Sequence, residues 1–583
     1  MIILTCLGSL TLPWMFDDHM VLQRQTPVPI WGSCEPHATV TAEFAGQSVS
    51  TKADSAGNWI LTLAPMTANN VGQSLTLNTN DTTKIISDVL VGDVWLCAGQ
   101  SNMDFAVRSS VHQANDLTPL TEVRLCDRAP QLTQTAAKDF YAGTWQHATS
   151  ETILPFSAVG FFFAQDMQPS VNVPIGMIDI SLGGSTTEGW LPADTFAAYP
   201  ECASLLEDPF THPLTHPWVR GLARPHYFAP SYLYEAAIEP FAPFAIKGVL
   251  WYQGESNAHL PHWADRWFRH LVDAWRTLWS QPELPFFYVQ LPGMERPTWP
   301  LMRHVQSMWQ DIAQVFMAVS IDVGHPTDVH PNNKKPVGQR LSLLARNNLL
   351  LEDVECYGPT LAKHFRKDNE LWLEFDHAEG LVDQTGAIGA FELAGADRRF
   401  YPAHVTVHGN QLRLSSKQVD TPIDARYAHS AYPQTGLSNL QGLPAAPFRT
   451  YSWRPTRIAC IGDSITAGAG LANPQQQSYP AVLQAMLGAG FDVQNFGRSG
   501  CCVIESTLRG TWQRAYSKNI EHGSATLFQP DIVICNLGIN DVMEWDSKKK
   551  AFEKDYGTLL KHYKGLDSKP KILIASPLSP LFP

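Results

Sequence analysis

The sequence predicts an α/β protein in which layered units with parallel sheets are joined to regions of β-sandwich type. Short apolar runs at residues 173–180, 246–251 and 286–291 alternate with helical stretches. Strands covered by helices on both faces show such continuous apolar runs, which predicts a parallel sheet. Elsewhere apolar and polar residues alternate strictly, which predicts antiparallel sheets with one buried face.

Length and composition limit the classes of function. A chain of 583 residues is too long for one core and predicts about three folding units. Its 44% hydrophobic and 17% charged residues are typical of a soluble globular protein, and no apolar run has the length of a membrane span. The net charge of −13 argues against a nucleic-acid partner and suits a neutral substrate.

Ten cysteines are scattered along the chain without the spacing of a metal site. We therefore expect buried or half-buried thiols, a reducing compartment and no metal. Residues 1–7 are apolar, but the run is short and no basic residue precedes it, so a first strand is favoured over a secretory signal. This predicts a cytoplasmic protein, or a secreted or periplasmic one if the sequence lacks its signal; the oligomeric state is left open.

The first half of the chain contains two kinds of pattern. Residues 1–90 are expected to form a β-sandwich accessory region, because the segments 40–44 and 59–63 alternate and are separated by turn residues. Residues 91–354 carry the apolar runs of the first layered unit. The amphipathic segment 338–346 predicts the helix that closes this unit.

Residues 355–450 return to β alternation, with expected strands at 371–375, 404–407 and 411–414. These strands either complete the N-terminal sandwich or form one of their own. The proline-rich segment 444–449 is predicted to be a linker.

Residues 451–583 are expected to form a second, partial α/β unit. Its predicted strands lie at 457–461, 531–537 and 571–575. The two α/β units look like weak internal repeats of one chemistry.

Residues suited to serine catalysis follow the strands of the first unit in order. A serine needs a base to take its proton, a carboxylate to orient that base, and donors aimed at the oxyanion. Ser101 lies in a turn after the first strand, and the turns 183–185 and 253–257 follow two later strands. Asp328 and His330 come last, on a loop flanked by prolines. The carboxyl ends of parallel strands share one edge of the sheet, so we expect these groups to meet there.

The segments 94–103, 251–257 and 328–331 resemble the signatures of sialate O-acetylesterase-like carbohydrate esterases of the SGNH hydrolase superfamily. The likeness runs from residues 16–23 to residues 442–450. It implies an SGNH-type three-layer domain with β-sandwich accessory regions.

The resemblance also implies catalytic roles. Ser101 would be the nucleophile, His330 the base and Asp328 the orienting acid. The superfamily usually has Asp-x-x-His, whereas the spacing here is Asp-x-His.

The implied oxyanion hole consists of Ser101 itself, Gly184, and Asn257 or Gln253, with Gly183 as an adjacent alternative to Gly184. Glu235 stands where the family pattern has an asparagine, so this residue either alters the pocket or faces solvent. Three aromatic residues could stack on a sugar ring or belong to the core: Trp190, Trp251 and Tyr252.

The second α/β unit contains segments similar to the first three blocks of ordinary GDSL-type hydrolases, at residues 462–466, 495–500 and 538–541. The resemblance implies a nucleophile and two oxyanion donors, which are Ser464, Gly500 and Asn540.

The closing Asp-x-x-His of that family does not follow in the sequence. His522 and His562 lie before the expected position, within expected helices or loops. We therefore expect a truncated and inactive second unit; the alternative is a base supplied by another chain.

The implied reaction is removal of O-acetyl groups from a carbohydrate through an acetyl-enzyme, with no cofactor and no metal. Sialic acids and plant cell-wall polysaccharides such as xylan or xyloglucan fit the resemblance. Two alternatives stay open. One is a carbohydrate-binding protein with a degenerate esterase core, and the other is a short-chain or lipase-like esterase.

Overall fold

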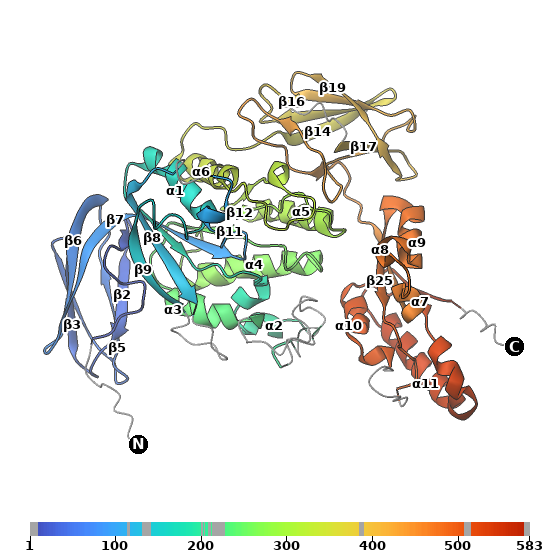
Figure 1. The fold of residues 1–583 in the computed structure, drawn as a ribbon, viewed down its shortest axis with the longest axis horizontal. Helices are drawn as coiled ribbons and strands as arrows, with labels where there is room; N and C mark the ends of the chain where they lie inside the picture. Colours follow the sequence, from blue (N-terminus) through green and yellow to red (C-terminus); the bar gives the residue numbers. More distant parts are fainter. Residues whose placement is uncertain are drawn as a thin grey trace.

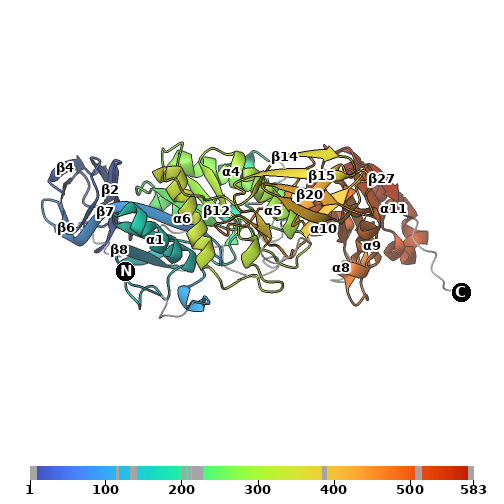
Figure 2. The same cartoon turned by 90° about the horizontal axis from the view of Figure 1, so that it is seen from above.

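The computed structural model describes residues 10–112, 117–130, 141–199, 202, 205–207, 212, 228–383, 390–505 and 515–575. A β unit at the N-terminal end is followed by a central α/β unit, a second β unit and a C-terminal α/β unit (Figure 1). The view from above shows the N-terminal β unit and the C-terminal α/β unit at opposite ends of the molecule (Figure 2). The strand predicted for residues 1–7 lies outside the described residues.

One long strand, β7 (Thr83–Gly99), runs through both the N-terminal β unit and the central sheet. Its first part pairs with β6 (Asn69–Asn78) and β1 (Val21–Gln23). Its second part pairs in parallel with β10 (Ile175–Asp179) and β11 (Gly248–Tyr252). The boundary predicted between residues 90 and 91 falls inside this strand, so the two units share a backbone element.

The remaining N-terminal strands are antiparallel, and the alternation predicted for residues 40–44 and 59–63 is observed. In β3 (Thr39–Phe44), Val40, Ala42 and Phe44 are buried while the residues between them are more exposed. Strand β3 pairs with both β4 (Gln47–Lys52) and β6, and β2 (Val28–Ser33) pairs with β5 (Asn58–Leu63).

The central sheet has the order β13-β12-β11-β7-β10-β8-β9, and all neighbours are parallel except β8 and β9. Its other strands are β8 (Leu120–Pro130), β9 (Tyr141–Ala148), β12 (Phe286–Val289) and β13 (Val315–Ala318). The three parallel strands predicted from the apolar runs are therefore confirmed as β10, β11 and β12. Consecutive strands β10 and β11 lie on opposite sides of β7, and ligands bind beyond the carboxyl ends of strands at such a switch point.

Helices cover both faces of this sheet, giving the predicted three layers (Figure 1). On one face α1 (Ala158–Val171) packs beside α6 (Lys335–Leu350), which contains the predicted helix 338–346. On the other face lie α4 (Pro261–Leu278) and α5 (Trp299–Met308). The shorter helical elements of this unit are η1 (Val107–Ser109), η3 (Thr187–Trp190), α2 (Asp194–Ala197), η6 (Tyr234–Ile238), α3 (Glu239–Phe241), η7 (Trp309–Asp311) and η8 (Ile321–Val323).

Aromatic side chains fill both interfaces between sheet and helices. Trp95 of β7 meets Phe163 of α1 with ring centroids 4.8 Å apart. On the opposite face Trp251 of β11 meets Trp275 of α4 at 5.9 Å. Burying rings of this size supplies a large share of the apolar area that holds the layers together.

The second β unit forms a sandwich of its own and does not complete the N-terminal one. Its apolar core consists of residues from within 361–448, and its sheets contain no described strand from elsewhere. One sheet contains β14 (Thr360–Lys367), β15 (Glu370–Asp376), β20 (Gln411–Ser415) and β19 (His404–His408); the other contains β18 (Phe400–Pro402), β17 (Phe391–Ala394), β21 (Asp424–Tyr427) and β23 (Phe448–Arg449), and β16 (Val382–Asp383) pairs with β22 (Leu437–Ser438).

The prediction of a linker at residues 444–449 is wrong. Ala445 is fully buried, and β23 pairs with β21. The Phe448 ring packs against Tyr427, with centroids 5.6 Å apart. Prolines suggested a linker, but this aromatic residue anchors the segment in the sandwich.

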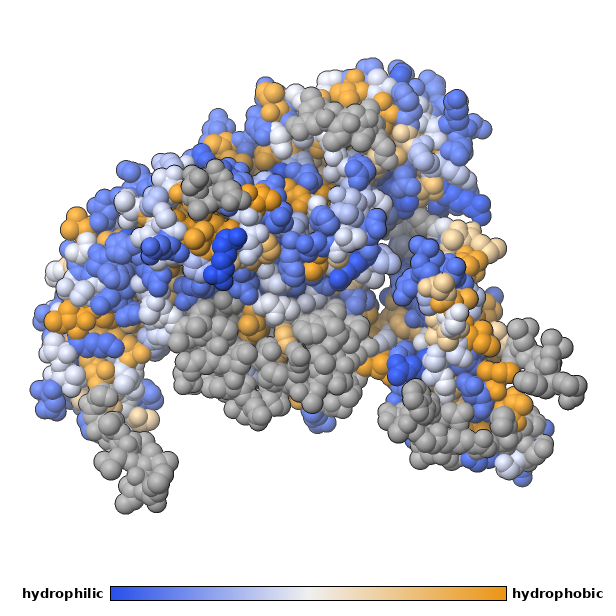
Figure 3. All heavy atoms as spheres, in the orientation of Figure 1, coloured by the Kyte–Doolittle hydropathy of each residue, from blue (hydrophilic) through white to orange (hydrophobic). Residues whose placement is uncertain are grey.

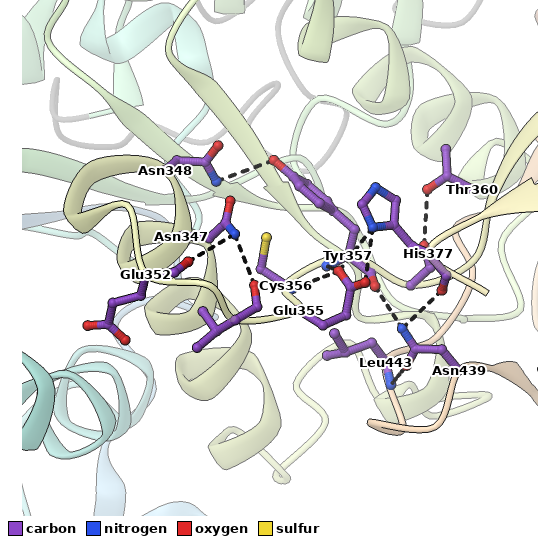
Figure 4. Close-up of polar contacts among 12 residues, drawn as sticks. Asn347, Asn348, Glu352, Glu355, Cys356, Tyr357, Thr360, His377, Asn439 and Leu443 are labelled. Atoms are coloured by element: carbon purple, nitrogen blue, oxygen red, sulfur yellow. Dashed lines mark hydrogen bonds and ion pairs between the residues drawn. The ribbon is translucent and has the colours of Figure 1, made fainter. Parts of the chain in front are cut away.

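A network of polar contacts fixes the connection between α6 and the second β unit (Figure 4). The side-chain amide of Asn439 donates to the backbone carbonyls of Tyr357 and His377, at 2.9 and 3.2 Å. The imidazole of His377 contacts the carboxylate of Glu355 at 3.0 Å. These contacts tie the second β unit to the end of the central unit.

The C-terminal α/β unit has a parallel sheet of order β25-β24-β26-β27. The three strands predicted here are confirmed as β24, β26 and β27. The unit contacts the central unit through His262 of α4, whose ring nitrogen lies 3.1 Å from the carbonyl oxygen of Leu527. Its elements are β24 (Thr456–Gly462), α7 (Ser464–Ala467), α8 (Pro474–Gln477), α9 (Tyr479–Leu487), η10 (Gly488–Gly490), β25 (Phe491–Gly497), η11 (Tyr516–Lys518), α10 (Ile520–Leu527), β26 (Ile532–Asn536), η12 (Ile539–Glu544), α11 (Trp545–Lys564) and β27 (Lys571–Ile574).

Polar residues cover most of the face seen in Figure 3, with apolar residues scattered among them. Within the part of the chain that the structure describes, no helix combines the length and the apolarity that crossing a membrane requires. The described cysteines are free thiols, and all except the half-buried Cys34 are buried, as expected from their spacing.

The close packing of the end of β7 against β11 can be tested with the substitution Gly99→Ala. Gly99 has φ +129°, and a Cβ there would lie 2.2 Å from the carbonyl oxygen of Tyr252 in β11. We expect the free energy of unfolding to fall by about 2–3 kcal/mol, measured by denaturant titration followed by tryptophan fluorescence.

Gly46→Ala is the matched control, because Gly46 also has positive φ (+77°) but no atom within 4 Å of the added Cβ. Its expected loss is about 1 kcal/mol, from the left-handed backbone alone. Equal losses in the two variants would contradict a steric requirement at Gly99.

Candidate active site

Ser101 lies in a tight turn two residues beyond β7, at the switch point of the sheet. The backbone N–H of Gln100 donates to the carbonyl of Tyr252 at 3.0 Å, and the N–H of Met103 donates back to Gln100 at 2.8 Å. The turn is thus closed on itself and tied to the neighbouring strand β11.

The structure brings Ser101 together with the predicted base. His330 lies in the loop between η8 and α6, and its Nε2 is 2.7 Å from the Oγ of Ser101. This distance is within the range for proton transfer from a nucleophile to a general base. Both side chains are half-buried, so a substrate can approach a pair that is partly shielded from water.

The surroundings of His330 favour its neutral form. Burial lowers the pKa of His330, the positive charge of Lys334 lowers it further, and the charge of Asp328 acts in the opposite direction. A base must be unprotonated to accept the proton of a serine, so a pKa below 6.5 keeps His330 competent at neutral pH.

Asp328 is exposed and close to His330 in the same loop. Among the described residues, its hydrogen bond to His330 runs from the backbone N–H of His330 to the Oδ1 of Asp328, at 2.8 Å, and not to the imidazole. The contact shapes the loop that carries the base. The role of Asp328 as the orienting acid stays a prediction.

The Gly183–Gly184 turn lies beside Ser101. Gly184 has φ +78°, and a Cβ added to Gly183 would lie 3.7 Å from the Cβ of Ser101. The hydroxyl of Ser185 donates to the carbonyl of Gly99 at 3.1 Å, which holds this turn against the end of β7. Backbone N–H groups of the turn are therefore near the place where an oxyanion would develop.

Gln253 and Asn257 are both buried, and their amides are joined in one network. Gln253 donates to the Oδ1 of Asn257, and Asn257 donates to the carboxylate of Glu188 at 2.8 Å. The hydroxyl of Thr187 donates to the Oε1 of Gln253 at 2.7 Å. The amide nitrogen of Gln253 also donates to the carbonyl of Ser185, at 3.5 Å, while that of Asn257 carries a second hydrogen. The role of either residue as oxyanion donor stays a prediction.

Sequence reasoning assigned no role to three buried residues behind Ser101 and His330. The side chain of Asn102 contacts both the carboxylate of Glu255 and the ammonium of Lys334. All three lie within or next to the quoted motifs. The sequence did not indicate that they are buried, because a polar stretch such as Asn-Asn-Lys-Lys at 332–335 is usually exposed to solvent.

Glu235 is exposed on η6, so of the two expectations for it the structure favours contact with solvent. Trp190 and Trp251 are fully buried, and Tyr252 is 1% exposed. These three aromatic residues belong to the core and present no face to a sugar.

In the C-terminal unit, Ser464 begins α7, and Gly500 lies in a turn with φ +79°. Asn540 donates to the carbonyl of Cys501 at 2.7 Å, next to Gly500. Two of the predicted residues, Gly500 and Asn540, thus lie close together.

The two candidate histidines of this unit have other partners. His522 of α10 contacts the hydroxyl of Tyr563 at 3.0 Å, and His562 of α11 contacts the hydroxyl of Thr526 at 2.8 Å. In the described ranges, no histidine forms a hydrogen bond with Ser464.

One group of possible metal ligands lies elsewhere, between the N-terminal unit and β9. His19 and His147 both contact the Oδ2 of Asp88, at 2.9 and 3.3 Å. The guanidinium of Arg124 also contacts this oxygen, at 3.2 Å, and already supplies a positive charge. The arrangement accounts for the carboxylate without a metal.

Comparison with known proteins agrees with this fold. Residues 91–343 match the family described as "Carbohydrate esterase, sialic acid-specific acetylesterase", and residues 460–583 match the "GDSL-like Lipase/Acylhydrolase family". Human sialate O-acetylesterase is 30% identical over 496 residues, which cover 74% of this chain and 91% of that protein. The crystal structure of a carbohydrate acetylesterase from Xanthomonas citri superposes with a TM-score of 0.68 at 32% identity, covering 76% of this chain and 100% of that one.

A shorter match extends to an acetylxylan esterase from Xylanibacter ruminicola, 40% identical over 85 residues, or 15% of this chain and 17% of that protein. The layered fold and these similarities define a carbohydrate esterase. More particularly, the chain belongs to the sialate O-acetylesterase family, and its C-terminal unit is similar to GDSL-type hydrolases.

The electrostatics of His330 predict the acidic limb of the pH profile. Protonated His330 cannot accept the serine proton, so activity should fall as pH drops through its pKa, which lies below 6.5. We expect kcat/KM for an acetyl ester to be half-maximal at a pH below 6.5. A half-maximal point clearly above 6.5 would contradict the lowered pKa.

Proposed function

We propose that the central unit removes O-acetyl groups from carbohydrates through an acetyl-enzyme formed on Ser101. The observation that carries this proposal is the 2.7 Å contact between the Oγ of Ser101 and the Nε2 of His330. Membership of the sialate O-acetylesterase family supports the acetyl group and the carbohydrate as the two parts of the substrate.

In the first step the Oγ of Ser101 attacks the acetyl carbonyl carbon while the Nε2 of His330 takes the hydroxyl proton. The oxyanion would accept hydrogen bonds from the backbone N–H groups of Ser101 and Gly184, and from the side chain of Gln253 or Asn257. Collapse of this intermediate breaks the bond to the sugar oxygen, which leaves as a hydroxyl with the proton from His330.

In the second step a water molecule gives a proton to the Nε2 of His330 and attacks the acetyl carbonyl. The bond to Ser101 breaks, acetate leaves, and the serine oxygen recovers its proton from His330. Asp328 would stabilise the imidazolium that exists transiently in both steps, through the charge that raises the pKa of His330.

The proposed substrates are O-acetylated sialic acids and acetylated plant polysaccharides such as xylan or xyloglucan. The names of the relatives support both classes of substrate, since one relative is a sialate O-acetylesterase and another is an acetylxylan esterase. Acetate release from the three substrates, compared as kcat/KM, distinguishes between these two classes.

Two alternative functions would give different experimental results. A carbohydrate-binding protein with a degenerate core would bind these glycans without releasing acetate, but the intact pair of Ser101 and His330 argues against it. A lipase-like esterase would hydrolyse long-chain aryl esters faster than aryl acetates, and a series of acyl lengths measures this directly.

Replacing each candidate nucleophile separately tests the proposal. We expect Ser101→Ala to reduce acetate release by roughly 10⁴- to 10⁶-fold, because the acetyl-enzyme can no longer form. Ser464→Ala should leave the rate close to that of the wild type, because no described histidine forms a hydrogen bond with Ser464.

Circular dichroism and the thermal midpoint serve as controls for folding in both variants. Retained acetate release in Ser101→Ala would refute the proposal. Loss of release in a folded Ser464→Ala would place the reaction in the C-terminal unit.

A further inference from the structure

A buried polar cluster lies directly behind the catalytic pair. Asn102 is 0% exposed, Lys334 1% and Glu255 5%. Burying an ammonium and a carboxylate costs several kcal/mol per ion unless they are well compensated, so such a cluster needs a reason.

Asn102 connects the two chain segments that carry the catalytic groups. It directly follows Ser101 and donates to the carbonyl of Val329, the residue directly before His330, at 2.9 Å. Its Nδ2 also donates to the carboxylate of Glu255, and its Oδ1 accepts from Lys334. The amide therefore has both hydrogens and its oxygen engaged, which leaves it one orientation.

Lys334 completes that orientation. Its ammonium is a donor without an acceptor and bonds the oxygen of the Asn102 amide, while Val329 and Glu255 accept from the nitrogen. The ammonium also lies 4.9 Å from the ring centre of Phe105 and 5.3 Å from that of Tyr252. These rings come from the segment after Ser101 and from β11, so one charge holds three segments together.

Charged side chains of both signs also surround Ser101 and His330. Lys334 faces Glu255 across Asn102, and Arg296 acts on Glu255 from a separate segment. In the histidine loop, the charge of Lys334 lowers the pKa of His330 and that of Asp328 raises it. Burial lowers the pKa of Lys334 itself to about 7.

We propose that Lys334 is a positioning residue of this esterase. Its hydrogen bond to the Oδ1 of Asn102 holds in place the amide that ties the turn of Ser101 to the loop of His330. The proposal rests on the proposed roles of Ser101 and His330. It adds the group that fixes the positions of these two residues relative to each other.

The test is Lys334→Met, which keeps the apolar stem and removes both the donor and the charge. We expect kcat for acetate release to fall by about 100-fold, because a small displacement of reacting groups costs this much. KM should stay close to the wild-type value, since Lys334 is 1% exposed and offers no surface to a substrate. The acidic limb of the kcat/KM profile should move to higher pH, because the charge that lowers the pKa of His330 is gone.

Lys335→Met is the matched control. Lys335 is the next residue, is half-buried, and forms none of the contacts of the cluster. Its kcat and pH profile should equal those of the wild type.

Lys334→Met removes one of the two positive charges that act on the buried Glu255 and is expected to lower the thermal midpoint. The double variant Lys334→Met/Glu255→Gln removes both charges. It should recover the midpoint but not kcat, because the oxygen of the Asn102 amide still lacks its donor and the contacts of residue 334 with Phe105 and Tyr252 are still weakened. This result would separate positioning from folding.

Ser101→Ala is measured in the same series. If it is inactive while a folded Lys334→Met keeps the wild-type kcat and acidic limb, the positioning role is refuted and the proposed function stands. Full recovery of kcat in the double variant would also refute it, because the charges would then serve folding alone. If Ser101→Ala stays active, the proposed function fails and the positioning role fails with it.

Discussion

The hydrogen bond between Ser101 and His330 joins positions 229 residues apart in the chain, and the rest of the central unit serves to keep it at 2.7 Å. Strand β7 ends two residues before Ser101, at one edge of the sheet, and the loop before α6 places His330 at the same edge. A displacement of about 1 Å between such groups costs about two orders of magnitude in rate. The packing of β7, β11 and α6 therefore determines how closely Ser101 and His330 approach each other.

The layered fold and the Ser101–His330 pair could be predicted from the sequence, because their signals are local. Apolar runs mark the strands β10, β11 and β12, and each polar turn follows its own strand. The parallel sheet then brings the turns to one edge. The 17-residue strand β7, shared by two units, could not be predicted, because its two halves show different patterns.

Other features depend on contacts that sequence spacing does not reveal. Lys334 lies in a polar stretch that reads as exposed, yet its side chain is buried against Phe105 and Tyr252. The segment 444–449 reads as a linker, yet Phe448 is packed into a sandwich. The hydrogen bond of Asp328 to the backbone of His330 likewise depends on the shape of the loop.

The C-terminal unit contains Ser464 at the start of a helix and a Gly500–Asn540 pair, but His522 and His562 contact Tyr563 and Thr526. We therefore expect one reactive serine in the chain, Ser101. Stoichiometric labelling with a fluorophosphonate, followed by peptide mapping, tests this most directly. One label per chain on Ser101, rising in step with the loss of acetate release, is the predicted result; a label on Ser464, or loss of activity without a label on Ser101, would contradict it.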